Sequence, residues 1–116
     1  MSITSYFKQL ILNTVFLQAP FPPIDFYVGL ANSGTEVSDA NYKRIPVAFE
    51  LNGTVVVNKA AKEFPAAASY FTYDQYILCD AVSGGNQLDL YAVGDITIVP
   101  GQKITMGAGD VSFSIA

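Results

Sequence analysis

The chain has 116 residues, of which 51% are hydrophobic and 14% are charged, so its length suits one domain, residues 1–116, with a single two-layer core. Its formal net charge is −4 and its basic residues are scattered, which argues against a nucleic-acid binder because such proteins need a basic patch. No apolar run approaches the ~18 residues that span a membrane, and we expect neither a membrane segment nor a signal peptide.

The N-terminal segment, residues 1–20, predicts a helix. Apolar residues recur at three-to-four spacing over residues 3–17, which would give the helix one apolar face, and Ser2 or Thr4 can cap its start. Prolines between positions 20 and 23 should end it, because proline lacks an N–H group and forces the preceding residue to be extended. We expect the apolar face to be buried on the domain's own sheet rather than against another subunit.

From Asp25 onward the pattern changes to alternation or to short apolar runs bounded by turn residues, which is typical of strands. Asn52-Gly53 suits a two-residue hairpin turn of the primed type, and the segment 83–86 suits a four-residue hairpin loop. Pro100-Gly101 suits a type II turn, and Gly107 to Gly109 separates the last two strands.

Many short strands with turn signals every 8–12 residues predict a mainly β fold. We expect an antiparallel β-sandwich or jelly-roll-like domain over residues 25–116, with one N-terminal α-helix. Residues 60–73 fit an irregular crossover between sheets. The expected strands are residues 25–32, 43–51, 54–59, 74–82, 87–93, 95–99, 102–106 and 110–115.

The sequence offers little catalytic chemistry. It has no His, which excludes Ser-His-Asp and Cys-His nucleophilic sites, and its one cysteine, Cys79, cannot build a tetrahedral zinc site. Cys79 lies in an apolar run and is expected to be a small buried residue. A chain without an intramolecular disulfide fits synthesis in a reducing cytoplasm. We expect no enzyme activity, no catalytic residue, no cofactor and no metal.

Two binding alternatives stay open. Five aspartates are expected at strand edges or turns, where a calcium site could form, although no two share a spacing that forces them together. Clustered aromatic residues could form a sugar-stacking surface, or equally a core and an interface. The aspartates are Asp74, Asp80, Asp89, Asp95 and Asp110, and the aromatic residues are Tyr70, Phe71, Tyr73 and Tyr76.

The loop from Gly34 to Arg44 is the candidate working surface. It spans about ten residues between two strands that two residues could join, so it is longer than folding requires. Its charged residues beside an aromatic one suit an interface with a hydrophobic centre and a charged rim, and the alternative is a solvated loop. The candidate interface residues are Glu36, Tyr42, Lys43 and Arg44.

The most distinctive segments occur in a fixed order. Pro-Pro is followed by Phe-Tyr-Val-Gly-Leu, then by Gly-Thr-Glu-Val-Ser, and then by Tyr-Lys-Arg-Ile-Pro-Val-Ala-Phe. Lys-Glu-Phe-Pro-Ala-Ala and the closing Val-Pro-Gly-Gln-Lys-Ile-Thr-Met-Gly-Ala-Gly-Asp-Val come later. Over nearly the whole chain this order resembles a family of small virion proteins of tailed bacteriophages. The chain lacks the Trp expected after the Phe-Pro element, where Tyr70 or Phe71 stands instead.

The resemblance implies a structural component of a phage virion, made in the host bacterial cytoplasm. We expect a capsid decoration (cement) protein that sits on the head shell, self-associates with a trimer favoured, and staples neighbouring subunits. Its partners would be itself and the major capsid protein or other virion proteins. The alternative is a tail-associated or tail-fibre protein that contacts the host surface, and a small calcium- or sugar-binding module comes third.

Overall fold

The computed structural model describes residues 3–18, 25–53 and 55–114. Within these residues the chain forms one helix and ten strands, and the sheets are antiparallel. The mainly β class with a helix near the N-terminus is therefore confirmed. The elements are α1 (Ser5–Phe16), β1 (Tyr27–Asn32), β2 (Thr35–Glu36), β3 (Ile45–Pro46), β4 (Phe49–Asn52), β5 (Val55–Asn58), β6 (Lys62–Glu63), β7 (Phe71–Cys79), β8 (Gln87–Ile98), β9 (Thr105–Met106) and β10 (Ser112–Ser114).

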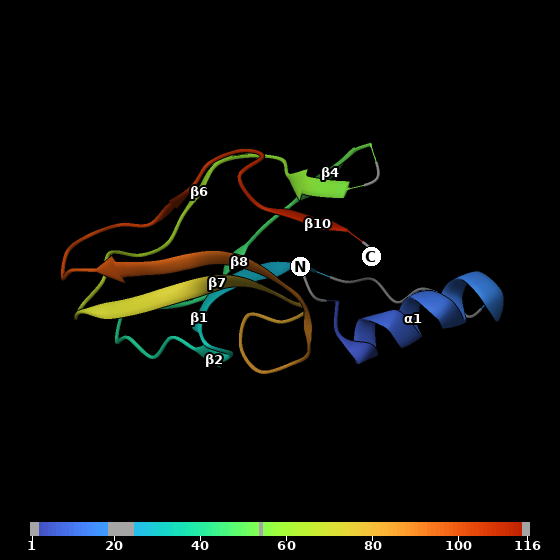
Figure 1. Ribbon diagram of the computed structural model, residues 1–116, viewed down its shortest axis with the longest axis horizontal. Coiled ribbons are helices and arrows are strands. Elements are labelled where there is room, and N and C mark those ends of the chain that lie inside the picture. The colour runs from blue at the N-terminus through green and yellow to red at the C-terminus, as the bar shows by residue number, and fades with distance from the viewer. Residues whose placement is uncertain (1–2, 19–24, 54, 115–116) are drawn as a thin grey trace.

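Three sheets build the body. The main sheet has the order β2-β1-β7-β8, and β3 also pairs with β1. A second sheet has the order β10-β5-β4, and β6 pairs with β9. The two smaller sheets lie across from the main sheet, so the arrangement is sandwich-like (Figure 1). Each sheet combines strands from before residue 64 with strands from after residue 70.

The core fills the space between these layers. Strands of the main sheet supply side chains such as Leu30 and Leu88, and Met106 enters from β9; all three are fully buried. Phe64, just after β6, stacks on Tyr76 of β7 with ring centroids 6.5 Å apart. These contacts hold the crossover segment against the main sheet. The large apolar side chains that are fully buried are Val28, Leu30, Cys79, Leu88, Ile98, Met106 and Val111.

Asn58 is a polar residue of this core, only 1% exposed. Its carboxamide oxygen accepts the N–H of Val111 at 2.9 Å, and its amino group donates to the carbonyls of Gly107 at 2.7 Å and Ala60 at 3.2 Å. Burying an amide is costly unless its polar atoms are paired, and here both are. Asn58 thereby joins β5 to the turn between β9 and β10.

The start of α1 is fixed on β8. The side-chain oxygen of Thr4 accepts the N–H of Phe7 at 3.3 Å, as an N-cap does. The same hydroxyl donates to the carbonyl of Gln87 at 2.8 Å, and the N–H of Thr4 donates to the carbonyl of Leu88 at 2.8 Å. Phe7, in the first turn, packs against the core.

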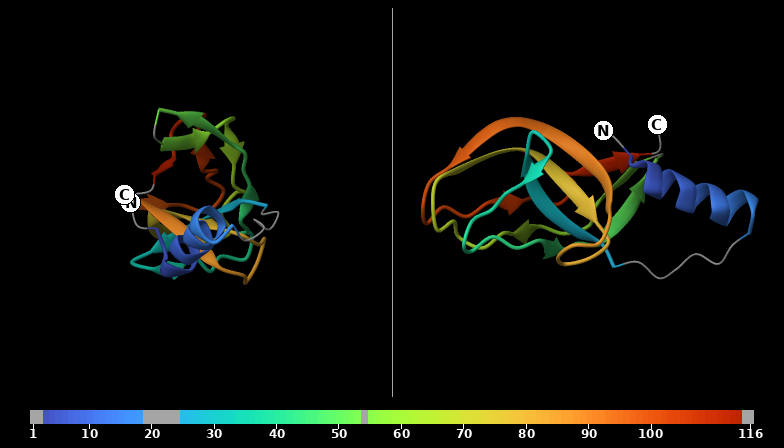
Figure 2. Two further views of the ribbon diagram at one scale, coloured as in Figure 1. Left: turned by 90° about the vertical axis from the view of Figure 1, so that its right-hand side faces the viewer. Right: turned by 90° about the horizontal axis from the view of Figure 1, so that it is seen from below.

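Beyond that first turn α1 projects from one end of the body (Figures 1 and 2). None of its residues is buried. The prediction that its apolar face would be buried on the domain's own sheet is therefore wrong. The bonds of Thr4 to β8 anchor the helix at its start alone, and its axis then leads away from the sheet.

A residue in the left-handed conformation follows the C-terminal end of α1. The N–H of Leu17 bonds to the carbonyl of Asn13 at 3.1 Å, and Gln18 follows with a φ of 55°. The prolines that were expected to end the helix lie outside the described residues. In the part of the chain that the structure describes, no helix is long and apolar enough to cross a membrane.

Strand boundaries differ from the prediction in several places. Residues 43–51 hold two short strands, β3 and β4, in place of one, whereas residues 87–93 and 95–99 form the single strand β8. Gly94 interrupts the pattern of β8 with a φ of 80°, near a register shift against β7. β2 and β6 lie in segments expected to be irregular, and β7 begins three residues before residue 74. Two-residue strands have no periodicity to reveal them.

The turns were predicted more accurately than the strand ends. The type II turn is confirmed, since Gly101 has a φ of 84° and the N–H of Gln102 bonds to the carbonyl of Val99 at 3.1 Å. In the β4–β5 hairpin Asn52 pairs with Val55, so Gly53 rather than Asn52 opens the turn. The β7–β8 loop runs over residues 80–86 and is longer than the predicted four residues.

Candidate functional site

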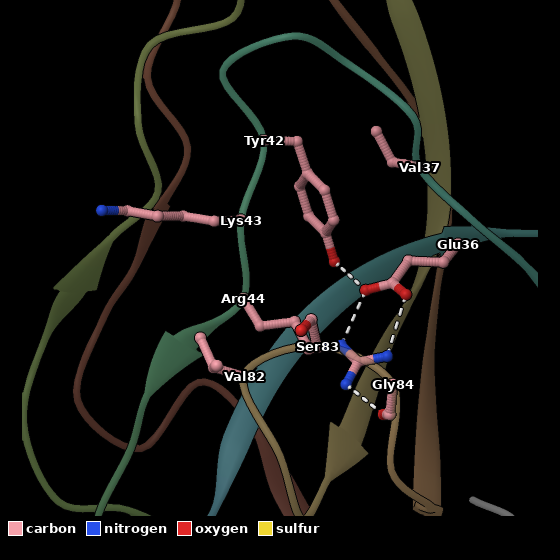
Figure 3. Close-up of a pocket in the computed structure, with 8 residues that line it drawn as sticks. All are labelled: Glu36, Val37, Tyr42, Lys43, Arg44, Val82, Ser83 and Gly84. Carbon is pink, nitrogen blue, oxygen red and sulfur yellow. Dashed lines mark hydrogen bonds and ion pairs between the residues drawn. The ribbon is translucent and has the colours of Figure 1, made fainter.

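The Gly34–Arg44 loop begins with a tight turn. Ser33 and Gly34 both have positive φ, 51° and 86°, and this reversal pairs β2 back onto the end of β1. Their N–H groups bond to the side chains of Asp74 at 2.9 Å and Gln75 at 3.1 Å. The turn is thus fixed against β7, and Glu36 of β2 faces the returning half of the loop (Figure 3).

Glu36, Tyr42 and Arg44 form a hydrogen-bonded cluster, which we call the latch (Figure 3). The Tyr42 hydroxyl donates to Oε2 of Glu36 at 2.5 Å. Arg44 binds the same carboxylate through two atoms, Nε to Oε2 at 2.8 Å and Nη2 to Oε1 at 2.9 Å. Two-point pairing of this kind is stronger and more directional than a single ionic contact. The latch closes the loop on itself.

The latch also holds the β7–β8 loop. Nη1 of Arg44 donates to the carbonyls of Ala81 and Gly84, both at 2.8 Å. Within that loop the carboxylate of Asp80 accepts the backbone N–H of Asn86 at 2.7 Å and its side-chain amide at 3.0 Å. One guanidinium group therefore fastens together two loops that are far apart in the sequence.

A second, smaller apolar cluster lies beside these loops. It contains Ala31, Ile77 and Cys79, with Leu90 packed against it, and it is separate from the main core. Burial raises the pKa of the Cys79 thiol to about 11, although nearby Arg44 acts in the opposite direction. Cys79 is thus an inert buried thiol, as the sequence predicted.

Gly29 makes room for the latch. The N–H of Leu30 donates to the Tyr42 oxygen at 3.0 Å, which brings the tyrosine tip directly over Gly29. A Cβ atom at Gly29 would overlap the Tyr42 oxygen and lie 3.1 Å from Oε2 of Glu36. The glycine of the Phe-Tyr-Val-Gly-Leu segment therefore has a packing reason.

Asp39 fastens the tip of the loop to the crossover segment. Its carboxylate accepts the N–H of Ala68 at 3.0 Å, and the N–H and hydroxyl of Ser69 at 2.9 Å and 2.6 Å. The side chain of Asn41 adds a bond to the carbonyl of Ala66 at 3.0 Å. The bond from Ala68, with those from Ser69, lowers the pKa of Asp39. These partners were not predicted, because most are backbone groups without a residue-type signal.

Acid should weaken the latch. Hydrogen bonds from Arg44 hold the pKa of Glu36 below its ordinary value of 4.5, although desolvation acts the other way. A carboxyl group whose pKa is lowered by folding stabilises the fold above its unfolded pKa, and this stability is lost as the pH falls through the folded pKa. We expect the free energy of unfolding, measured with urea at a series of pH values, to decrease below about pH 4.5. Glu36→Gln should make the decrease shallower, and an equally steep decrease would contradict this origin.

An open cleft of about 370 Å³ lies beside the latch. Lys43 borders it but points away from the latch, and Val82 of the β7–β8 loop is 54% exposed. Of the four predicted interface residues, the structure thus brings Glu36, Tyr42 and Arg44 together and leaves Lys43 at the rim. The lining residues are Glu36, Val37, Tyr42, Lys43, Arg44, Val82, Ser83 and Gly84.

The polar groups of this site are used in bonds within the subunit. Glu36 and Arg44 neutralise each other, and burial together with the bond to Glu36 raises the pKa of Tyr42, so its hydroxyl stays protonated. Among the described residues, no three His, Cys, Asp or Glu side chains gather as a metal site would require. The expected position at a strand edge or turn was wrong for three of the five aspartates. Asp74 lies within β7, and Asp89 and Asp95 lie within β8, where Asp89 is also buried.

The aromatic residues do not form one exposed platform. Tyr73 and Tyr76 are buried and meet edge to face with centroids 5.9 Å apart, whereas Tyr70 is 73% exposed. Phe71 is half-buried and packs against the core. A sugar-stacking surface built from all four is therefore not what the structure forms, and most of the cluster belongs to the core.

Comparison with known proteins gives one family. A family model described as "Podophage GP4 fiber I protein gp80" matches residues 2–114. A search of curated proteins finds no match.

Proposed function

We infer the role of this chain from the family to which it belongs, the podophage GP4 fiber I protein gp80 family of phage virion structural proteins. We propose that the chain is a subunit of a fibre on the phage particle. The observation that carries the proposal is a family match over nearly the whole chain. The predicted resemblance to small virion proteins of tailed phages is thereby confirmed at the level of the family.

A structural, non-catalytic role agrees with the site. The latch residues bond to one another and to backbone carbonyls, so their polar groups serve to fix two loops. The projecting helix carries apolar side chains that remain in contact with water. A small β domain with an exposed apolar helix is suited to assembly with other protein chains.

The position on the particle is the finer part of the proposal. The family description names a fibre, which favours the alternative that the sequence left open over decoration of the head shell. Head decoration, with the major capsid protein as partner, stays a prediction. We place the chain in a fibre and expect its partners to be other virion proteins.

The rim of the cleft is the proposed contact surface of the Gly34–Arg44 loop. Lys43 and Val82 are exposed at this rim and can reach a partner, whereas Tyr42 and Arg44 are already used inside the subunit. Glu36, Tyr42 and Arg44 would then hold the shape of the rim, and Lys43 with Val82 would meet the neighbouring chain. This arrangement keeps the predicted loop as an interface but divides its residues between two tasks.

Gold-labelled antibodies against the chain should locate it on intact virions. We expect label on fibres, and none when the antibodies are first absorbed with purified protein. Label over the faces of the head would contradict the fibre proposal and support decoration.

Virions propagated with Lys43→Ala and Val82→Ser together should carry less label than virions with the exposed control Lys103→Ala. Equal label on the two kinds of virion would show that the rim of the cleft is not part of the contact.

A further inference from the structure

The uncovered side of α1 is strongly apolar. Leu12, Val15 and Phe16 are spaced by three and four residues and so share one face of the helix. Their exposed fractions are 51%, 62% and 74%, and Leu17 at the C-cap is also 74% exposed. These four residues form what we call the α1 face. Side chains of this kind are normally removed from water.

The α1 face is large enough to matter for association. Its four side chains expose on the order of 400 Å² of mostly apolar surface, within the range of the largest patches on soluble monomers. A stable pair of proteins buries about 800 Å² on each partner, so this one helix face supplies roughly half of that area. The helix projects from the body (Figure 2), and the exposed fractions of these side chains show that the face is accessible to another chain.

The same side of the helix carries a groove. It has a volume of about 230 Å³ and is lined by Ile3, Lys8, Ile11 and Leu12. Phe16 stands one turn beyond Leu12, so a groove and a bulky side chain lie next to each other on one surface. A surface that holds both is complementary to itself, which is the requirement of a two-fold interface.

The charges of α1 are compatible with a copy of itself as the partner. The helix has one charged residue, Lys8, and no acidic residue. Two copies of the helix therefore bring only Lys8 as a charged residue to a shared contact, which would consist mainly of apolar packing. If two helices pack antiparallel about an axis at Leu12, residue 16 of one copy lies opposite residue 8 of the other. Phe16 then covers the stem of Lys8 and enters the groove.

We propose that two copies of this chain associate through α1, face to face and antiparallel, with Phe16 of each copy in the Ile3–Leu12 groove of the other. This proposal concerns the protein in solution and does not depend on its place on the virion. It assigns a partner to the helix face that the sequence had expected to be covered by the domain's own sheet. It also differs from the favoured trimer.

Light scattering during gel filtration tests the proposal on the full chain. Wild-type protein should have twice the monomer mass of 12.5 kDa, and Leu12→Ser with Phe16→Ser should have the monomer mass with unchanged circular dichroism. Leu51→Ser is the matched control, because Leu51 is equally exposed at 74% but lies on β4. It should remain a dimer.

Cross-linking provides a second test, in a mixed pair that keeps one of the two contacts between Phe16 and the groove. Cys79 is 1% exposed, so a cysteine introduced at the surface is the reactive thiol of the chain. Lys8→Cys protein mixed with Phe16→Cys protein should form covalent pairs with a short bismaleimide, and Leu51→Cys protein should not. The pairing of position 8 with position 16 is specific to the antiparallel arrangement.

Several results would overturn the proposal. A wild-type mass of one copy would show that the face has no second copy as its occupant, and binding of that monomer to a purified fibre or head protein would identify a different one. A mass of three copies would replace the two-fold pair by the predicted trimer. Dissociation by Leu51→Ser, with an intact dimer for the α1 variant, would move the interface to the β4 region.

Discussion

Asn58→Leu is expected to lower the free energy of unfolding by about 3 kcal/mol or more. The side chain is almost completely buried and pairs with Val111, Gly107 and Ala60. Leucine has a similar size but no polar atom, so these backbone groups would lose their partners within the fold. A buried polar group without a partner costs about 1–3 kcal/mol, and this substitution creates more than one.

Urea unfolding monitored by tyrosine fluorescence measures this effect. Asn32→Leu is the matched control, since Asn32 is an exposed residue at the end of β1 and its replacement should change stability by less than about 0.5 kcal/mol. Similar losses for both variants would mean that Asn58 is not the hydrogen-bonding link between β5 and the β9–β10 turn.

Arg44→Met is expected to lower the free energy of unfolding by about 2 kcal/mol. Methionine keeps much of the aliphatic stem but removes four hydrogen bonds, two to Glu36 and two to the β7–β8 loop. Hydrogen bonds to a charged group are worth more than neutral ones, while the partial exposure of Glu36 reduces the gain. We expect the β7–β8 loop to open locally before the rest of the fold.

Amide hydrogen exchange can separate this local opening from global unfolding. Exchange at the N–H of Asn86, which bonds to Asp80, should become faster in Arg44→Met. The N–H of Leu78, in the central strand β7, should follow the global change only. Lys43→Met is the matched control, because it removes the same charge one residue earlier from a side chain that points away from the latch. An equal effect of the two variants on exchange at Asn86 would contradict the role of Arg44 in holding the β7–β8 loop.

Much of the fold could be predicted because its signals are local. The alternation of apolar and polar residues revealed the β class, and Pro100-Gly101 revealed its turn through the backbone preferences of two residues. The helix was also predictable from its spacing. The sequence could not show whether the domain's own sheet covers the helix. An apolar face indicates only that burial is favourable and not which surface provides it.

The candidate site was predictable in part for a similar reason. Glu36, Tyr42 and Arg44 stood out as a charged and aromatic loop, but a hydrogen-bonded cluster and an exposed interface use the same residue types. The difference comes from Leu30, Ala81 and Gly84, whose backbone groups bind the latch. Any residue type offers these groups, so no sequence pattern marks them.

The interleaving of the sheets has a consequence for how the protein is made. Each of the three sheets needs a strand from the last half of the chain, and β5 waits for β10, the final strand described. A nascent chain on the ribosome can form α1 and short hairpins, but it cannot complete a sheet until β7 has emerged. Shortened translation products should thus be unfolded and cleared by proteases, which keeps incomplete subunits out of assembling particles.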